Sequence, residues 1–188
     1  MASKIEIANM ALGLVGADPI LAVDNSTQAG RVVNLFYDSC KKAVLREHAW
    51  NFATRRVALV EFGSTPAFQW DKYFVLPVDC IRVLQLNETN DSFHIEGSLL
   101  ACDQVSASIE YTYNVLEGDF DPMFTEAFAY ALAAHMAIAL SKSPQLSREI
   151  REIYETVILP AARTVSSQES SGDVWLADDF LLARTSGV

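Results

Sequence analysis

The feature that most constrains the fold is a long stretch with almost no polar face, from Asp121 to Ser141. Alanines alternate there with Phe, Leu, Met and Ile, and the stretch opens on an aspartate followed by Pro122, which is typical of a helix start. A helix that is apolar on every side must lie in the centre of a bundle, and its small side chains let neighbouring helices approach closely. The sequence therefore predicts a central helix that needs other helices around it.

Those other helices are predicted at both ends of the chain. Ser3 and Glu6 form a capping box that opens the first helix, and an amphipathic second helix follows before residue 48. After the central helix comes a fourth, also amphipathic, which Pro160 should kink or end. We expect the helices of 3–48 and 121–160 to form one bundle.

Between them, the pattern changes to short segments rich in β-branched and aromatic residues, separated by Gly, Pro and Asn turns. The connections are too short for crossover helices, so the strands should pair mainly antiparallel. The predicted fold class is therefore α+β: a helical bundle built from both ends of the chain with a central β insertion at 54–115. Residues 1–165 would form this domain.

The C-terminal residues 166–188 read as a flexible linker and an extended arm. The linker is rich in serine, and the segment after it is apolar and aromatic. An apolar cluster exposed to water would promote nonspecific association unless it bound a partner, although it could also fold back on its own bundle. The residues predicted to contact a partner are Trp175, Leu176, Phe180, Leu181 and Leu182.

The amino-acid composition indicates a globular protein and argues against some classes of function. The chain is 51% hydrophobic and 20% charged, which is typical of a globular protein, and its net charge is −10. An acidic surface argues against a protein that grips nucleic acid, because such binding relies on Lys and Arg. We expect neither a secretion signal nor a membrane span, and the three cysteines, Cys40, Cys80 and Cys102, read as reduced and buried in a protein made in the cytoplasm.

No strong catalytic or cofactor motif stands out, so we expect no enzyme activity and no cofactor. His48 lies at a predicted helix end and His94 in a hairpin. His135 lies in the central helix, where it could serve as a ligand or base but is expected to be a hydrogen-bonded core residue.

Two further groups could in principle form a site. Asp119 with Asp121, or the pair at 178–179, could hold a metal, but Asp121 is needed as a helix cap and neighbouring carboxylates in an extended segment point apart. Trp50 and Trp70 could line a ligand pocket, although aromatic residues where helices meet a sheet usually serve packing. We therefore predict no metal site.

Four segments of the chain, in order, resemble the tail tubular protein A family of short-tailed bacteriophages and related head-to-tail adaptors. The similarity spans most of residues 1–165. The segments are HAWNFATRR and its continuation at 48–59, LPVDCIRV at 76–83, IEY at 109–111, and FDPMFTEA at 120–127 with the alanine-rich helix that follows.

The resemblance implies a structural protein of the virion, made in the host cytoplasm. It implies a ring of about twelve copies at the head-tail joint, between the portal protein and the tail tube or nozzle. DNA would pass through the ring as cargo without being bound specifically, which an acidic wall would favour. No catalysis is implied.

Two other readings stay open. One is a small-molecule-binding or hydrolytic α+β protein with its site at the helix-sheet junction, around Trp50, Trp70 and His94. The other is a related completion factor that acts at a different joint of the virion. An oligomeric ring would favour an assembly protein, whereas a compact monomer with a ligand in an apolar pocket would favour the first alternative.

Overall fold

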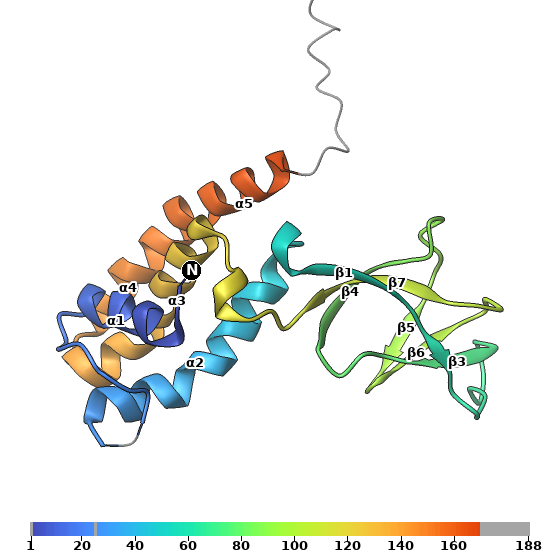
Figure 1. Ribbon diagram of the computed structural model, residues 1–188, viewed down its shortest axis with the longest axis horizontal. Coiled ribbons are helices and arrows are strands. Elements are labelled where there is room, and N and C mark those ends of the chain that lie inside the picture. Colours follow the sequence, from blue (N-terminus) through green and yellow to red (C-terminus); the bar gives the residue numbers. More distant parts are fainter. Residues whose placement is uncertain (1, 25, 170–188) are drawn as a thin grey trace, which may run out of the picture.

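The computed structural model describes residues 2–24 and 26–169 of the 188-residue chain. Helices occupy one end of the molecule and strands the other, and the chain crosses between them near the start of β1 and the end of β7 (Figure 1). The fold is α+β with antiparallel strand pairing, which confirms the predicted class.

Helix α3, Pro122–Ser141, is the central element of the helical part. Asp121 caps it by accepting hydrogen bonds from the amides of Met123 and Phe124, at 2.8 and 3.2 Å. Among the described residues, α3 is long and apolar enough to cross a membrane, but 61% of that stretch is buried inside the protein. Its apolar side chains are used to pack against other helices.

The remaining helices cover α3 from both ends of the sequence. The capping box is confirmed: Ser3 Oγ accepts from the Glu6 amide at 3.2 Å, and Glu6 Oε2 accepts from the Ser3 amide at 2.7 Å. The helices that contact α3 are α1 (Lys4–Leu14), α2 (Gln28–Glu47), α4 (Pro144–Ile153) and α5 (Leu159–Gln168).

Helices α4 and α5 are joined without a break by a π-helical turn, Tyr154–Ile158. The sequence predicts that Pro160 kinks or ends this helix, and the helix does not end there. Pro160 lies in the first turn of α5, directly after the wide π turn, and the chain stays helical to Gln168. A proline inside a regular α-helix lacks one hydrogen-bond donor and clashes with the preceding turn, and a local π turn is one of the ways a helix adapts.

The predicted start of the linker at Ser166 also needs correction. Ser166 lies inside α5 and is 7% exposed. Its hydroxyl accepts a hydrogen bond from the Asn51 amide at 3.3 Å, and its carbonyl accepts one from the Asn51 side chain. Serine composition alone did not reveal that Ser166 has a partner far away in the sequence.

The strands form two antiparallel sheets in the predicted insertion. The first has the order β1-β7-β4 and the second β2-β3-β6-β5. The first sheet contains β1 (Thr54–Ala58), β7 (Ser108–Tyr113) and β4 (Cys80–Leu86). The second contains β2 (Val60–Glu61), β3 (Lys72–Val75), β6 (Leu99–Cys102) and β5 (His94–Glu96).

The sheets have a small core of their own, separate from the helical core. Phe74, Leu86, Leu100, Ile109 and Tyr111 are among its buried members. The helical core is larger and is built mainly on α3, with side chains from every other helix. The distal sheet therefore has one face on a small core, and no helix within residues 2–24 and 26–169 covers its other face.

The buried alanines of α3 provide a test of this packing. Ala134 is 3% exposed, so Ala134→Leu should overpack the helices and lower the free energy of unfolding by about 1 to 3 kcal/mol. Ala139 lies on the same helix but is exposed, and Ala139→Leu is the matched control. Chemical denaturation of both variants should show a loss for Ala134→Leu alone; equal stabilities would contradict the packing described here.

Candidate assembly surface

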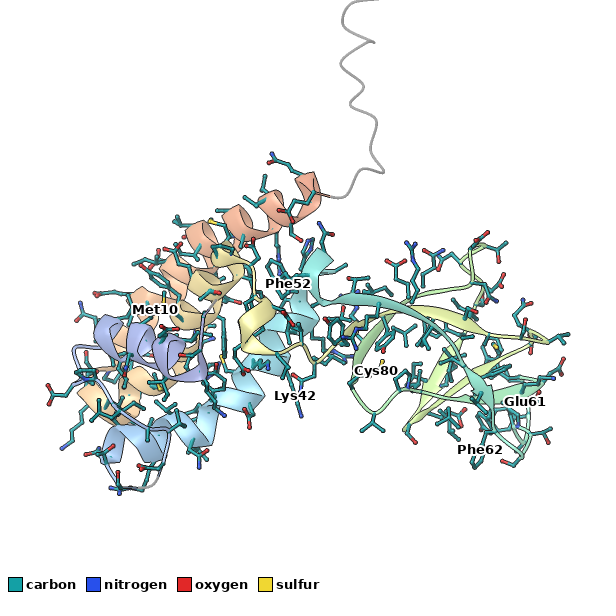
Figure 2. All side chains as sticks on the ribbon, viewed as in Figure 1. Met10, Lys42, Phe52, Glu61, Phe62 and Cys80 are labelled. Atoms are coloured by element: carbon teal, nitrogen blue, oxygen red, sulfur yellow. The ribbon has the colours of Figure 1, made fainter. Side chains whose placement is uncertain are left out.

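The helices and the sheets are joined by a cluster of aromatic rings. Trp50 is 1% exposed and donates its indole N–H to the Val44 carbonyl at 3.0 Å. Its ring and those of Phe52 and Phe120 all make edge contacts with Phe124 of α3, with centroids 4.8 to 5.0 Å apart. Figure 2 shows Phe52 at this junction. Trp50 is a packing residue with its one donor satisfied.

A buried ion pair closes the same junction. Lys41 Nζ of α2 lies 3.0 Å from Glu117 Oε1, with side chains 8% and 20% exposed. The Lys41 ammonium also lies 5.3 Å from the centre of the Phe120 ring. Burial, followed by the Glu117 carboxylate, raises the pKa of the Tyr37 hydroxyl far above its ordinary value. This pair fixes the short 3-10 helix Glu117–Asp119, which leads from the sheets into α3, onto α2.

The residues of the alternative pocket do not come together. Trp50 belongs to the helical core, whereas Trp70 is a half-buried residue just before β3 and His94 lies exposed on β5. Strands β3 and β5 both flank β6 in the distal sheet. None of the three lines the cavities described below, so they do not form a site.

His135 differs from its prediction as a core residue. It lies on the exposed side of α3, and its ring stacks on Phe36 with centroids 6.1 Å apart. Partial burial, and then the charge of Arg151, lowers the pKa of its imidazole. The sequence could not reveal this, because a helix with apolar residues on all sides does not indicate which side faces water.

His48 and the cysteines behave as structural residues. The ring of His48 lies 5.0 Å from Trp50, and partial burial, Arg163 and Arg82 lower its pKa, in that order of effect. All three cysteines are free thiols. Burial raises the pKa of Cys40 to about 12, so this thiol has little of the thiolate character that reactivity requires.

A small cavity of 170 Å³ lies beside the π turn, between α2 and α3. The polar groups around it bind one another: Glu47 Oε2 accepts from the Tyr154 hydroxyl at 3.0 Å and from Arg163 at 3.3 Å. Typical ligand sites have volumes of about 300 to 1,000 Å³. This cavity is smaller than typical ligand sites, and its Glu47 carboxylate is already bound by Tyr154 and Arg163.

A larger hollow of 460 Å³ lies where α2 meets the loop before β4. Its lining includes Lys42 and Cys80, which Figure 2 labels near the junction. Another lining residue, Arg46, donates to the Ile81 carbonyl at 2.7 Å, and burial raises the pKa of the Cys80 thiol. The hollow therefore offers neither an activated nucleophile nor an obvious acid-base pair.

Acidic residues do not form a metal site in the part of the chain that the structure describes, where no group of three or more His, Cys, Asp or Glu side chains converges. Asp121 is used as the cap of α3, and Asp119 ends the preceding 3-10 helix. The pair Asp178 and Asp179 lies outside the described residues.

The strand part presents an exposed apolar surface at the end of the molecule away from the helices. Val60 and Val75 are directly paired across β2 and β3, so they share one face, and alternation places Phe62 on that face as well. Their exposed fractions are 74%, 41% and 43%, and Phe68 in the following loop is 80% exposed. Figure 2 shows Phe62 at this end. We call Val60, Phe62, Phe68 and Val75 the distal surface.

β1 is the last strand of one sheet and β2 is the last strand of the other. The Leu59 amide donates to Ala107, on the β7 side, and the Phe62 amide donates to Tyr73 of β3. Because amides alternate in direction along a strand, β7 and β3 lie on opposite sides of this segment, and β1 and β2 are each open on one side only. Unpaired backbone groups along such an edge are a ready template for another strand. The open sides of β1 and β2 and the distal surface together are the candidate assembly surface among the described residues.

The five residues predicted from the sequence to contact a partner, Trp175, Leu176, Phe180, Leu181 and Leu182, lie outside the described residues. Their role stays a prediction. The edge positions of β1 and β2 were missed from the sequence. The only sequence signal was the segment from Thr54 to Glu61, which no turn residue interrupts. The order of strands in a sheet decides which strands lie at an edge, and that order is not visible in this segment.

Comparison with protein-family models gives no match, and comparison with curated proteins gives none either.

The junction ion pair predicts a stability effect. Lys41→Met leaves Glu117 half-buried without its cation and should lower the free energy of unfolding by about 1 to 3 kcal/mol. The double variant Lys41→Met, Glu117→Gln should lose less stability than the sum of the losses of the two single variants, because the two groups interact. The control is Lys72→Met, which removes the more exposed pair with Glu61 and should cost at most about 1 kcal/mol. If urea denaturation showed that the two single losses of stability simply add in the double variant, the coupling between Lys41 and Glu117 would be contradicted.

The two histidines with lowered pKa predict a pH dependence. His48 and His135 have a pKa near 6.5 in the unfolded chain and a lower pKa in the folded protein. Below about pH 6.5 the unfolded chain therefore binds more protons than the folded protein. Their contribution to stability is complete above that pH and is lost as the pH falls through the lowered folded pKa. A His48→Gln, His135→Gln double variant should lose less stability than the parent between about pH 7.5 and about pH 5.5. An identical loss in denaturation measurements would show that other groups control this range.

Proposed function

We propose that the protein is a non-catalytic structural protein of a tailed bacteriophage, forming a ring-shaped adaptor between the portal of the head and the tail. The four segments that resemble the tail tubular protein A family support this assignment. In this proposal the helices from both ends of the chain are a bundle in each subunit, and the C-terminal arm contacts a neighbouring subunit or the portal.

The observation that carries the proposal is the candidate assembly surface. Proteins that act as monomers usually protect strand edges and avoid contiguous exposed apolar patches. Here β1 and β2 are each the last strand of their sheet, and four exposed apolar side chains, two of them phenylalanines, lie on and beside β2 and β3. A surface of this kind is what repeated contacts between subunits would cover.

The charge of the chain agrees with a channel for DNA. A net charge of −10 would repel phosphates from the wall of a ring, so that DNA passes without adhering. Binding to DNA would instead require a basic surface. DNA is therefore proposed as cargo and not as a ligand.

The small-molecule or hydrolytic alternative has less support. Trp50 belongs to the helical core, whereas Trp70 and His94 lie at the distal sheet, so the three residues do not form one site. The hollow at the junction holds no activated nucleophile.

The direct test is the mass and shape of the purified full-length protein, alone and with a portal protein from the same virus. Electron microscopy and mass photometry should show rings of many copies or a ring attached to the portal. A protein that stays a monomer under both conditions would overturn the proposal. Attachment to a tail component but not to the portal would instead place the protein at another joint.

The role of the arm can be tested separately. Deleting residues 174–188 removes the predicted anchors Trp175 and Phe180 and should leave a soluble protein with nearly the parent melting temperature. Ring formation or portal attachment should weaken, because each arm contact is repeated around the ring. The control is a chain of full length with Thr185→Ala beyond the apolar cluster. A truncated protein that unfolds would favour an arm folded on its own bundle.

A further inference from the structure

We propose that the C-terminal segment 174–182 of one copy docks into the hollow between α2 and the loop before β4 of the next copy. The 460 Å³ hollow, whose lining includes Lys42, Arg46, Val78 and Cys80, is called the acceptor hollow below. This inference rests on the proposed function and identifies the surface that receives the arm. The occupant is a segment of this chain that lies outside the described residues.

The rim of the acceptor hollow is positively charged. Lys42 and Arg46 are exposed and lie one turn apart on α2, where β-carbons are about 5 to 6 Å apart. In the part of the chain that the structure describes, the Lys42 ammonium has no ion-pair partner, and Arg46 uses only Nη1, on the Ile81 carbonyl. The exposed Arg82 adds a third charge beside them, because its Nη1 donates to the Arg46 carbonyl at 3.2 Å. These cations can still bind carboxylates.

The single acidic residue of the lining does not cancel this charge. The Oδ2 atom of Asp79 lies 3.6 Å from Arg55 Nη1. Its Oδ1 atom accepts a hydrogen bond from the Tyr111 hydroxyl at 3.3 Å. Because Arg55 balances Asp79, the charges of Lys42 and Arg46 are left to attract an acidic partner.

The wall of the acceptor hollow is apolar and held in place. Val78 is fully exposed in the loop, and Ala43 of α2 is exposed beside it in the lining. The loop is fixed at both ends of its turn: the Cys80 amide donates to the Pro77 carbonyl at 3.0 Å, and the Asn114 amide donates to the Asp79 carbonyl at 2.9 Å. The volume lies within the range of about 300 to 1,000 Å³ that is typical of binding sites. The hollow therefore suits a partner with both apolar and acidic groups.

The C-terminal segment has this combination. Residues 169–183 contain four carboxylates and no Lys or Arg, and Asp178-Asp179 is the only pair of adjacent acidic residues in the sequence. Two adjacent carboxylates match two cations one helical turn apart. Apolar residues lie on both sides of the pair, including Trp175 and Phe180, and can cover the apolar wall while the carboxylates meet the rim.

The position of α5 favours a hollow on another copy. Glu47 of α2 binds Tyr154 and Arg163, so this side of α2 faces α5 and the turn before it. At 3.6 residues per turn, Lys42 lies about 140° around α2 from Glu47. Figure 2 likewise shows Lys42 and Cys80 on one side of Phe52 and α5 on the other. The segment therefore starts on the side of the molecule opposite to its own acceptor hollow.

The same arrangement explains how a ring could close. From Gln168 to Asp178 an extended chain spans at most about 33 to 36 Å, which is enough to leave the subunit. Because the arm and the acceptor hollow are different surfaces of one chain, each copy can give an arm to one neighbour and receive one from the other. Contacts of this head-to-tail type generate rings when the rotation closes.

A disulfide cross-link in the full-length protein tests both the location and the source of the segment. Cys80 is a free thiol in the lining of the hollow. Ala177→Cys places a thiol beside Asp178 without removing a carboxylate or an aromatic residue, and Thr185→Cys, beyond the apolar cluster, is the matched control. After oxidation of assembled protein with copper phenanthroline in air, Ala177→Cys should give a ladder of covalent oligomers on a non-reducing gel. Adding Cys80→Ser should abolish the ladder, and Thr185→Cys should give much less of it.

The product of the cross-link distinguishes the possible occupants of the hollow. A Cys80 disulfide within one chain would show that the segment fills its own hollow, and it would overturn the exchange between copies. Assembled rings in which Ala177→Cys forms no bond to Cys80, or bonds only to the portal, would overturn the acceptor hollow itself.

A charge exchange tests the proposed ionic contact. Lys42→Glu, and separately Asp178→Lys with Asp179→Lys, should each raise the concentration needed for ring formation by about tenfold. Combining the changes should recover part of the loss, because opposite charges again face each other. The control is Lys142→Glu, which makes the same change in net charge at an exposed lysine after α3 and should assemble like the parent.

Two results of the charge exchange would contradict the contact: losses that simply add in the combined variant, and an equal loss in Lys142→Glu, which would show that net charge controls assembly. The melting temperature of each variant checks that it is folded.

The outcomes separate this inference from the proposed function. Parent protein that forms no ring, with or without a portal, contradicts the adaptor function and the arm exchange with it. Parent rings that show no cross-link to Cys80, and that Lys42→Glu forms equally well, leave the adaptor function standing and overturn the arm exchange alone.

Discussion

The burial of α3 is the constraint on which the rest of the structure depends. A helix with apolar side chains on nearly every side is stable in water only when other elements cover it, and here α1, α2, α4 and α5 do so. These helices come from both ends of the chain. The strands are consequently an excursion from the helical part, connected to it at two points that must lie close together.

Those two points are fixed by one group of contacts. Trp50 and Phe52 precede β1, Phe120 follows β7, and all three rings pack against Phe124 of α3. The pair of Lys41 and Glu117 adds a directional contact beside them. Because the described helices are occupied in covering α3, none of them covers the outer face of the distal sheet. The exposed distal surface follows from this division of the chain.

The sequence predicted the features that local chemistry decides. The capping box of Ser3 and Glu6, the Asp121 cap and the antiparallel sheets are confirmed, because each depends on neighbouring residues or on short connections. The errors at Pro160 and Ser166 arose where a π turn and a contact with Asn51 override local preference. The exposure of His135 and the edge position of β1 depend on tertiary arrangement, which a uniform apolar pattern does not encode.

The charges on the edge bear on a problem that any exposed strand poses. Two identical edges from two copies could pair with each other and lead to aggregation. The two arginines of β1 already have partners: Arg56 binds Glu110 at 2.7 Å, and Arg55 Nη1 lies 3.6 Å from Asp79 Oδ2 with its guanidinium over the Tyr113 ring. Charged side chains along a strand edge are one of the ways in which proteins discourage pairing with an identical copy, so these ion pairs would protect the open side of β1.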